Sequence, residues 1–99
     1  MKALRINNGQ VALEEIPVPT ATESEAVIKI ERAGVCNTDL EILKGYHNFT
    51  GTLGHEFVGT VYDAKIKDFI GKRVVADINQ ACMKCHVCGN GGMHHCPNR

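Results

Sequence analysis

Apolar residues recur at every second position in several short stretches along the first two-thirds of the chain. In one of them Ala26, Ile28 and Ile30 alternate with polar residues, which is the period of a strand with one buried face. The other stretches are short, rich in β-branched or aromatic residues and bounded by turn residues: Lys2–Ile6, Val11–Ile16, Phe57–Tyr62 and Arg73–Ile78. Each is typical of a strand. We therefore predict a mainly β fold, and short strands joined by turns favour a small β-barrel.

One helix is predicted among these strands. Thr38 and Glu41 have the spacing of a capping box, in which two side chains satisfy free backbone groups at the start of a helix. An apolar face follows, and Gly45 provides an end to the helix. Gly59 lies inside a predicted strand, where it indicates a bulge or the close approach of another backbone segment.

The periodic pattern stops after Ala81, and the remaining residues are rich in Cys, Gly and His. Four of the five cysteines lie within fifteen residues. In an intracellular chain such a cluster is more typical of metal binding than of disulfides. A chain of 99 residues forms one domain with a modest core, so a bound metal would contribute to its stability. We expect a single domain, 1–99, that includes an irregular zinc lobe at 82–96.

Charge and hydropathy narrow the function classes. Eleven basic residues balance eleven acidic ones, so no electrostatic footprint points to nucleic acid or to an anionic membrane. No apolar run is long enough to span a bilayer, and the first residues lack the apolar segment of a secretory signal. We expect a cytoplasmic protein that binds neither nucleic acid nor membranes.

The cysteines of the lobe have the spacing C-x2-C-x2-C-x7-C, at Cys82, Cys85, Cys88 and Cys96. A two-residue gap lets successive thiolates turn toward one point, and the longer gap closes the shell. Four thiolates suit tetrahedral zinc, and a full shell leaves no position for a substrate. The spacing therefore predicts a structural zinc site.

Three other interpretations of the lobe stay open. The ending Cys96-Pro97 fits an iron–sulfur loop, although the last gap is seven residues where ferredoxin loops have three. A Cys-x-x-Cys redox pair lacks a surrounding βαβ pattern, and unliganded cysteines are the remaining possibility. With four cysteines present, His86, His94 and His95 are predicted to be solvated loop residues.

A second group of potential ligands precedes the lobe. The fifth cysteine, Cys36, lies in G-V-C-N-T-D, and His55 and Glu56 follow in G-H-E-F-V-G. Together they offer one thiolate, one imidazole and one carboxylate, the ligand types of a catalytic zinc with an open position. Adjacent strand residues point to opposite faces, so His55 and Glu56 can share a metal only where the backbone is irregular.

These motifs resemble those of one enzyme family. The matching pieces are G-V-C-N-T-D at 34–39, G-H-E-F-V-G at 54–59, G-K-R-V at 71–74 and the four-cysteine lobe ending in H-C-P-N-R at 95–99. In this order and at these spacings they resemble the N-terminal part of the zinc-dependent medium-chain alcohol dehydrogenases. The likeness covers most of the chain from residue 34 onward, and residues 1–33 match only as a strand pattern.

The resemblance implies a GroES-like, partly open β-barrel with a short helix and an irregular zinc lobe. It implies that Cys36 and His55 bind a catalytic zinc, and that Glu56 is a ligand or a close alternative. Asp39 would orient a ligand imidazole, and Thr38 would accept the proton of the alcohol. In such enzymes zinc polarises the oxygen of an alcohol or carbonyl substrate, and hydride passes between the substrate and NAD or NADP.

Two departures from the family limit the expected activity. Glu41 occupies the position at which many members carry a proton-relay histidine, so we expect the relay to be altered, absent or run by a carboxylate. No G-x-G-x-x-G pattern of a nicotinamide-binding domain is present, and the last family ligand of the catalytic zinc falls beyond residue 99. We expect a truncated form with a partly occupied catalytic site, no binding of NAD or NADP, and no alcohol oxidation by the isolated chain.

Truncation would also leave the strands of the barrel with unpaired edges and a bare apolar surface. We expect self-association through that surface. The main alternative function is a stand-alone zinc-binding module without redox activity, and an iron–sulfur electron carrier is less favoured. The co-chaperonin GroES shares the fold type and size, but the metal motifs argue against a chaperonin role.

Overall fold

The computed structural model describes all residues, 1–99, and its strands form two three-stranded antiparallel sheets. The first sheet has the order β2-β1-β4, with β1 at Lys2–Asn7, β2 at Gln10–Glu15 and β4 at Gly51–Thr52. The β1–β2 hairpin turns at Asn8 and Gly9, whose φ angles of 48° and 75° are both positive. Positive φ at both central residues is what a type I′ turn requires, and its twist matches that of the paired strands.

The second sheet has the order β3-β5-β6, with β3 at Ala26–Ala33, β5 at Phe57–Ala64 and β6 at Arg73–Val75. Gly59 lies where β5 approaches β3 most closely. A Cβ atom at position 59 would lie 2.5 Å from the carbonyl oxygen of Lys29. The β3–β5 register also shifts between Ile30 and Arg32, directly beside Gly59. Both features predicted for Gly59, a local irregularity and a close backbone approach, are therefore present.

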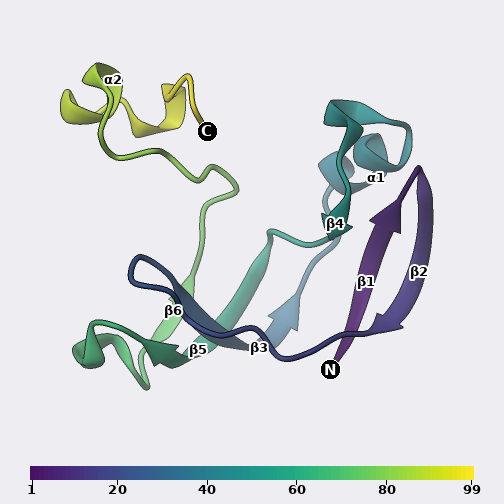
Figure 1. Ribbon diagram of the computed structural model, residues 1–99, viewed down its shortest axis with the longest axis horizontal. Coiled ribbons are helices and arrows are strands. Elements are labelled where there is room, and N and C mark those ends of the chain that lie inside the picture. Colours follow the sequence, from purple (N-terminus) through teal and green to yellow (C-terminus); the bar gives the residue numbers. More distant parts are fainter.

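The two sheets stand apart and do not close into a barrel (Figure 1). Ala3, Ile6, Val61 and Ala64 are buried, while a groove of about 980 Å³ lies between β1 and β3. Its lining includes side chains that remain largely exposed, among them Leu4, Val18, Ile30 and Tyr62. The prediction of a mainly β, partly open barrel is confirmed, and much of its apolar surface faces solvent.

The predicted helix exists as α1, Asn37–Leu43, but its predicted cap was wrong. The helix is capped by Cys36 and Asp39, two residues before the expected pair Thr38 and Glu41. The Cys36 sulfur accepts a hydrogen bond from the Thr38 N–H at 3.5 Å, and Asp39 Oδ2 accepts one from the Cys36 N–H at 2.9 Å. Sequence reasoning looked for a hydroxyl at the cap, whereas a thiol performs that role here.

The last predicted strand is shorter than expected, because β6 ends at Val75 and not at Ile78. The Asp77 carboxylate accepts a hydrogen bond from the Asn79 N–H at 2.7 Å. This local side-chain bond competes with strand pairing and turns the chain out of the sheet. The other predicted strands agree with the structure to within three residues, and β4 was not predicted.

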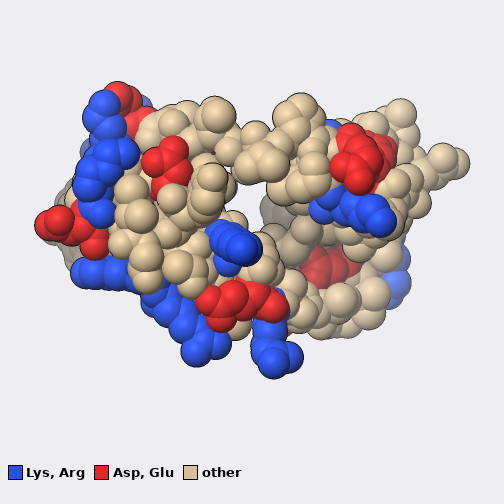
Figure 2. All heavy atoms as spheres, turned by 90° about the horizontal axis from the view of Figure 1, so that it is seen from below, with Lys and Arg blue, Asp and Glu red and all other residues tan.

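The cysteine-rich lobe lies away from both sheets, at the end of the segment that follows β6 (Figure 1). It contains α2, His86–Gly89, and the 3₁₀ turn η3, Met93–His95. Two further 3₁₀ turns are η1, Tyr46–Asn48, and η2, Lys67–Phe69. No helix of the structure has both the length and the apolar character needed to cross a membrane. Figure 2 shows basic and acidic side chains interspersed on the face that it displays.

Candidate metal centres

The sulfur atoms of Cys82, Cys85, Cys88 and Cys96 all lie within 4.8 Å of one another. The sulfurs of Cys85 and Cys96 are 3.9 Å apart. In a tetrahedral site with zinc–sulfur bonds of about 2.3 Å, the sulfurs are separated by about 3.8 Å. Cys88 and Cys96 are buried and the other two are half-buried. The geometry and the donor set therefore both fit one zinc ion in a closed shell.

Local backbone geometry brings these sulfurs together. Met83 and Gly91 adopt left-handed conformations, with φ angles of 60° and 80°, and so turn the chain on either side of α2. Two donors also point at sulfur atoms: the Cys82 N–H lies 3.4 Å from the Cys96 sulfur, and the Asn98 amide lies 3.7 Å from the Cys82 sulfur. Hydrogen bonds of this kind favour the thiolate form of a cysteine.

The thiols of the lobe differ in acidity. The backbone N–H of Lys84, with help from the Asn98 side chain, lowers the pKa of Cys82 from 9.0 to about 6. Burial raises the pKa of Cys88 to about 12, and the neighbouring Cys85 and Cys96 add to this. One thiolate is therefore favoured in the cluster, while further negative charge there needs a cation beside it. A dication bound by the four thiolates would supply the compensating positive charge.

The three imidazoles of the lobe are exposed and belong to neither cluster of potential ligands. His86 Nδ1 lies 2.7 Å from the side-chain amide nitrogen of Asn90, the residue that follows α2. His94 Nδ1 lies 3.4 Å from an Asp77 carboxylate oxygen. All three face solvent, as predicted, but they are not loop residues, because His86 lies on α2 and His94 and His95 lie on η3.

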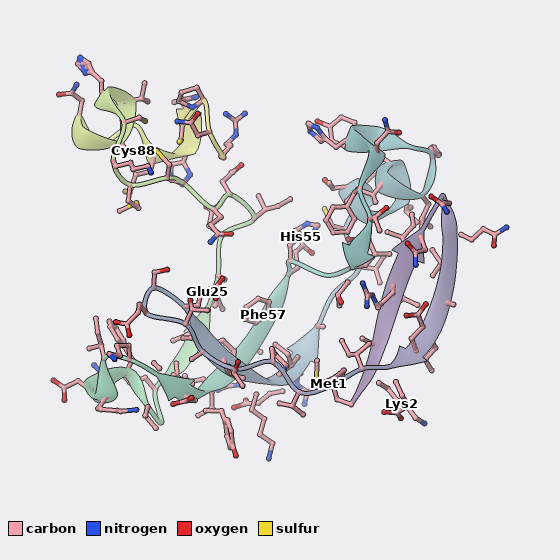
Figure 3. The ribbon with its side chains drawn as sticks, viewed as in Figure 1. Met1, Lys2, Glu25, His55, Phe57 and Cys88 are labelled. Atoms are coloured by element: carbon pink, nitrogen blue, oxygen red, sulfur yellow. The ribbon has the colours of Figure 1, made fainter.

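The second cluster brings together the Cys36 sulfur, a His55 ring nitrogen and a Glu56 carboxylate oxygen, all within 4.8 Å of one another. Cys36 comes from the cap of α1, and the other two come from the segment just before β5. Figure 3 places His55 above the start of β5, on the side of α1 and β4. Because β5 begins only at Phe57 and Gly54 has a φ of 117°, the alternation of a strand does not apply to His55 and Glu56. The irregular backbone that a shared site requires is present.

Asp39 connects two of these ligands. Its carboxylate is buried, with Oδ2 bound to the Cys36 N–H. Its Oδ1 is also buried, makes no hydrogen bond and lies 3.4 Å from His55 Nδ1. A small rotation of the ring would complete that bond and leave Nε2 of His55 for a metal, as in metal sites whose histidines bond to a carboxylate. The buried, unsatisfied oxygen thus fits a metal-binding role for His55.

Two further residues singled out in the sequence, Thr38 and Glu41, lie on α1, which follows Cys36. Thr38 is half-buried, and its hydroxyl oxygen accepts a contact from the Cys36 sulfur at 3.6 Å. Glu41, at the position of the family's relay histidine, binds Lys44 at 3.0 Å on the surface of α1. Its carboxylate is thus engaged in an ion pair. Sequence reasoning missed Gly34, whose N–H donates to the Glu56 carbonyl oxygen at 2.9 Å.

Comparison with known proteins identifies the family and agrees with the fold. The family model of the alcohol dehydrogenase GroES-like domain matches residues 22–99, and the chain belongs to this family. L-threonine 3-dehydrogenase of Xanthomonas oryzae pv. oryzae is 37% identical over 110 residues, which cover 99% of this chain and 32% of that enzyme. The chain therefore spans about a third of the length of such relatives.

Solved structures show the same fold. Zinc-dependent alcohol dehydrogenase 2 from Streptococcus pneumoniae has a TM-score of 0.81 and 29% identity, covering 100% of this chain and 31% of that one. An alcohol dehydrogenase from Escherichia coli CFT073, solved with NADH, has a TM-score of 0.85 and 29% identity, covering 97% and 30%. The resemblance and the GroES-like fold inferred from the sequence are confirmed.

Proposed function

We propose that this chain is the zinc-binding catalytic portion of a zinc-dependent dehydrogenase that interconverts a small alcohol and its carbonyl product with NAD or NADP. The observation that carries the proposal is the cluster of Cys36, His55 and Glu56 with the buried Asp39 carboxylate behind it. Three ligands of three chemical types leave a coordination position open, which suits exchange of a substrate.

Each residue of this cluster has a distinct role in the proposal. Cys36, His55 and Glu56 hold zinc, and Asp39 fixes the orientation of the His55 ring. When bound, zinc supplies a Lewis acid that polarises the substrate oxygen. Thr38, whose hydroxyl adjoins the Cys36 sulfur, takes up the proton of the alcohol as it passes its own hydroxyl proton on to solvent. Glu41 is paired with Lys44 and takes no part in proton transfer.

The lobe holds a second, structural zinc through Cys82, Cys85, Cys88 and Cys96. The closed shell leaves no position for a substrate, so its contribution is to the folding of the lobe. A stand-alone zinc module without redox activity would need this lobe alone. The open cluster around Cys36 would have no use in such a module, and this favours the dehydrogenase. An iron–sulfur carrier is the least favoured alternative.

Hydride transfer needs a nicotinamide held against the bound substrate, because proximity supplies much of the rate. We propose that the isolated chain neither binds NAD or NADP nor oxidises alcohols, and that it acts in the cytoplasm. An assay with zinc, either cofactor and L-threonine or a simple alcohol should show no turnover. Turnover that survives purification and is lost in a Cys36→Ser variant would contradict the inactivity of the chain.

Metal content tests the proposed sites directly. Elemental analysis of the wild-type chain should show zinc in excess of one ion per chain, and Cys36→Ser should reduce it to one. The same value of one in both proteins would contradict a site at Cys36. Iron in place of zinc would favour the electron carrier.

Self-association is proposed through the open side of the sheets. The edge of β3 is unpaired, and Leu4, Ile30 and Tyr62 beside it are exposed. A second copy of the chain could pair with this edge and cover the groove of about 980 Å³. Light scattering over a dilution series should show a dimer that dissociates, and a monomer at all concentrations would contradict the proposal.

A further inference from the structure

Gly34 lies directly against the side chain of Glu56. Its N–H donates to the Glu56 carbonyl oxygen at 2.9 Å, immediately after the last β3–β5 pair, Ala33 with Phe57. A Cβ atom at position 34 would lie 3.3 Å from Glu56 Oε2 and 3.8 Å from Glu56 Cβ. The Glu56 carboxylate therefore occupies space that any other residue at position 34 would partly fill.

Space, and not backbone conformation, explains the glycine at this position. Gly54, on the other side of His55, has a φ of 117°, where side chains are strained. The φ of Gly34 lies outside that left-handed region, so an alanine could adopt the same backbone. What an alanine would add is a Cβ atom 3.3 Å from Glu56 Oε2, which is closer than an ordinary contact.

The position of this carboxylate matters because Glu56 is the exposed member of the cluster. Cys36 and His55 are half-buried and held by the helix cap and by Asp39. Glu56 is exposed, and its side-chain oxygens form no hydrogen bond or ion pair within the chain. Bonds from zinc to carboxylate oxygen are about 2.0–2.2 Å long, so a displacement of a few tenths of an ångström is enough to weaken one.

We infer that Gly34 is a positioning residue that keeps the Glu56 carboxylate within reach of a metal held by Cys36 and His55. The inference rests on the proposed function, since it concerns the same site. The missing side chain gives the carboxylate a place beside the backbone, and the N–H of Gly34 fixes the backbone from which Glu56 extends. A methyl group at position 34 would push the carboxylate out of that place.

Cobalt(II) titration of chains whose lobe is already loaded with zinc tests this role. The visible bands of cobalt report the number and type of ligands, and the titration gives the affinity. Gly34→Ala should bind cobalt about tenfold more weakly than wild type, at the lower end of the loss caused by changing groups behind a ligand, and with shifted bands. Gly89→Ala is the matched control, because Gly89 has an ordinary φ and nothing within 4 Å of an added Cβ. It should leave the cobalt spectrum unchanged.

A double-mutant cycle separates this role from a general structural effect. If Gly34 acts through Glu56, then Gly34→Ala should add no further loss in a Glu56→Ala background. An equal loss in both backgrounds, or a Gly34→Ala spectrum identical to wild type, would overturn the inference and leave the proposed function standing. A wild-type chain without a cobalt–thiolate band that depends on Cys36 would instead overturn the proposed site, and the role of Gly34 with it.

Glu56→Asp provides a second measurement if Gly34→Ala does not fold. The aspartate side chain is shorter by one methylene group, so its carboxylate cannot reach the space beside Gly34. It should show a similar loss of cobalt affinity and a shift of the bands. Wild-type affinity in Glu56→Asp would overturn the inference, because the place of the carboxylate would then not matter.

Discussion

The four sulfur atoms of the lobe come from fifteen consecutive residues, whereas Cys36 and His55 are nineteen residues apart and come from different elements. In the lobe, tight turns and α2 set the ligands, and two of the sulfurs are buried. Around Cys36, a helix cap and the backbone hydrogen bond between Gly34 and Glu56, just beyond the ends of β3 and β5, position the ligands, and Glu56 stays exposed.

The metal therefore has a different part in the folding of each region. The lobe has little apolar core of its own, so the metal has to organise it, and binding free energy is also folding free energy there. The site around Cys36 is held by interactions that exist without a metal, such as the bond from the Cys36 N–H to Asp39. Loss of metal should therefore unfold the lobe, whereas the site around Cys36 should keep its structure without a metal.

The largest effect is expected from Cys85→Ser. Structural zinc contributes on the order of 10–16 kcal/mol to small domains of this kind, so the lobe should unfold and its zinc should be lost. Amide signals of 82–96 in an NMR spectrum should collapse to random-coil positions, while those of the two sheets stay dispersed. His86→Ala, one residue further on, should retain both the zinc and the spectrum. A folded lobe in Cys85→Ser would contradict this view of the region.

Cys36→Ser should remove the second metal without unfolding the chain. Serine is a good helix cap, so α1 should persist while the thiolate ligand disappears. We expect the zinc content to fall to one ion per chain by elemental analysis, with little change in circular dichroism. His94→Ala, which alters a surface pair with Asp77, should leave the zinc content as in wild type. Collapse of the sheets in Cys36→Ser would remove the distinction between the two regions.

Two substitutions of Asp39 separate its two contacts. Asp39→Ala removes both, and should lower the free energy of unfolding by about 1 kcal/mol through the lost cap and weaken zinc by about 10–100-fold. Asp39→Asn keeps an oxygen for the Cys36 N–H but loses the negative charge beside His55. Its free energy of unfolding in urea should therefore be close to that of wild type. Its zinc affinity, measured by competition with a chelator, should still be reduced. Wild-type zinc affinity in Asp39→Asn would show that the imidazole needs no carboxylate.

The smallest effect is a difference in thiol reactivity within the folded lobe, measured by a labelling pulse given as a chelator removes zinc and before the lobe unfolds. Iodoacetamide reacts with thiolates, so Cys82, whose pKa is lowered to about 6, should be labelled at neutral pH. Cys88, whose pKa is raised to about 12, should be labelled last. Peptide mass spectrometry over a pH series measures both midpoints, and zinc should protect both residues. Equal labelling rates for the two would contradict the assigned environments.

The same shifts also determine how pH changes the part of the stability of the folded lobe that does not come from zinc. The pKa of Cys82 is lower in the folded chain than the ordinary 9.0, so its thiolate stabilises the fold above that value. This contribution is lost as the pH falls through about 6. The pKa of Cys88 is raised, so its thiol stabilises the fold below 9.0, and that contribution is lost as the pH rises through about 12.

The sequence alone predicted the features that depend on nearby residues. The spacing of the lobe cysteines implies that their sulfur atoms converge, because the intervening loops are too short to carry them far apart. The ligand types of Cys36 and His55 suggested a shared zinc site, but only the family resemblance implied that both bind it, since nothing local relates residues nineteen positions apart. The two-residue β4 was missed because its pairing with β1 is formed between distant segments.

Two further misses have chemical causes. The cap of α1 was placed at Thr38 because a hydroxyl is the usual acceptor at a helix start, and the weaker acceptor Cys36 was not considered. Gly34 was read only as part of a motif, because its closeness to Glu56 exists only once β3 and β5 are paired. Contacts of this kind depend on the assembled sheet and have no periodic pattern in the sequence.

The close approach of β5 to β3 also restricts which sequences can carry this fold. Every codon one base away from a glycine codon, apart from stop and other glycine codons, encodes a residue with a Cβ atom. At Gly59 that atom would meet the Lys29 carbonyl oxygen at 2.5 Å and a methyl group of Ile28 at 2.7 Å. A library that samples all twenty amino acids at position 59 and is sorted for folded protein should therefore return glycine almost alone. For a protein engineer, this position belongs to the scaffold and not to the variable surface.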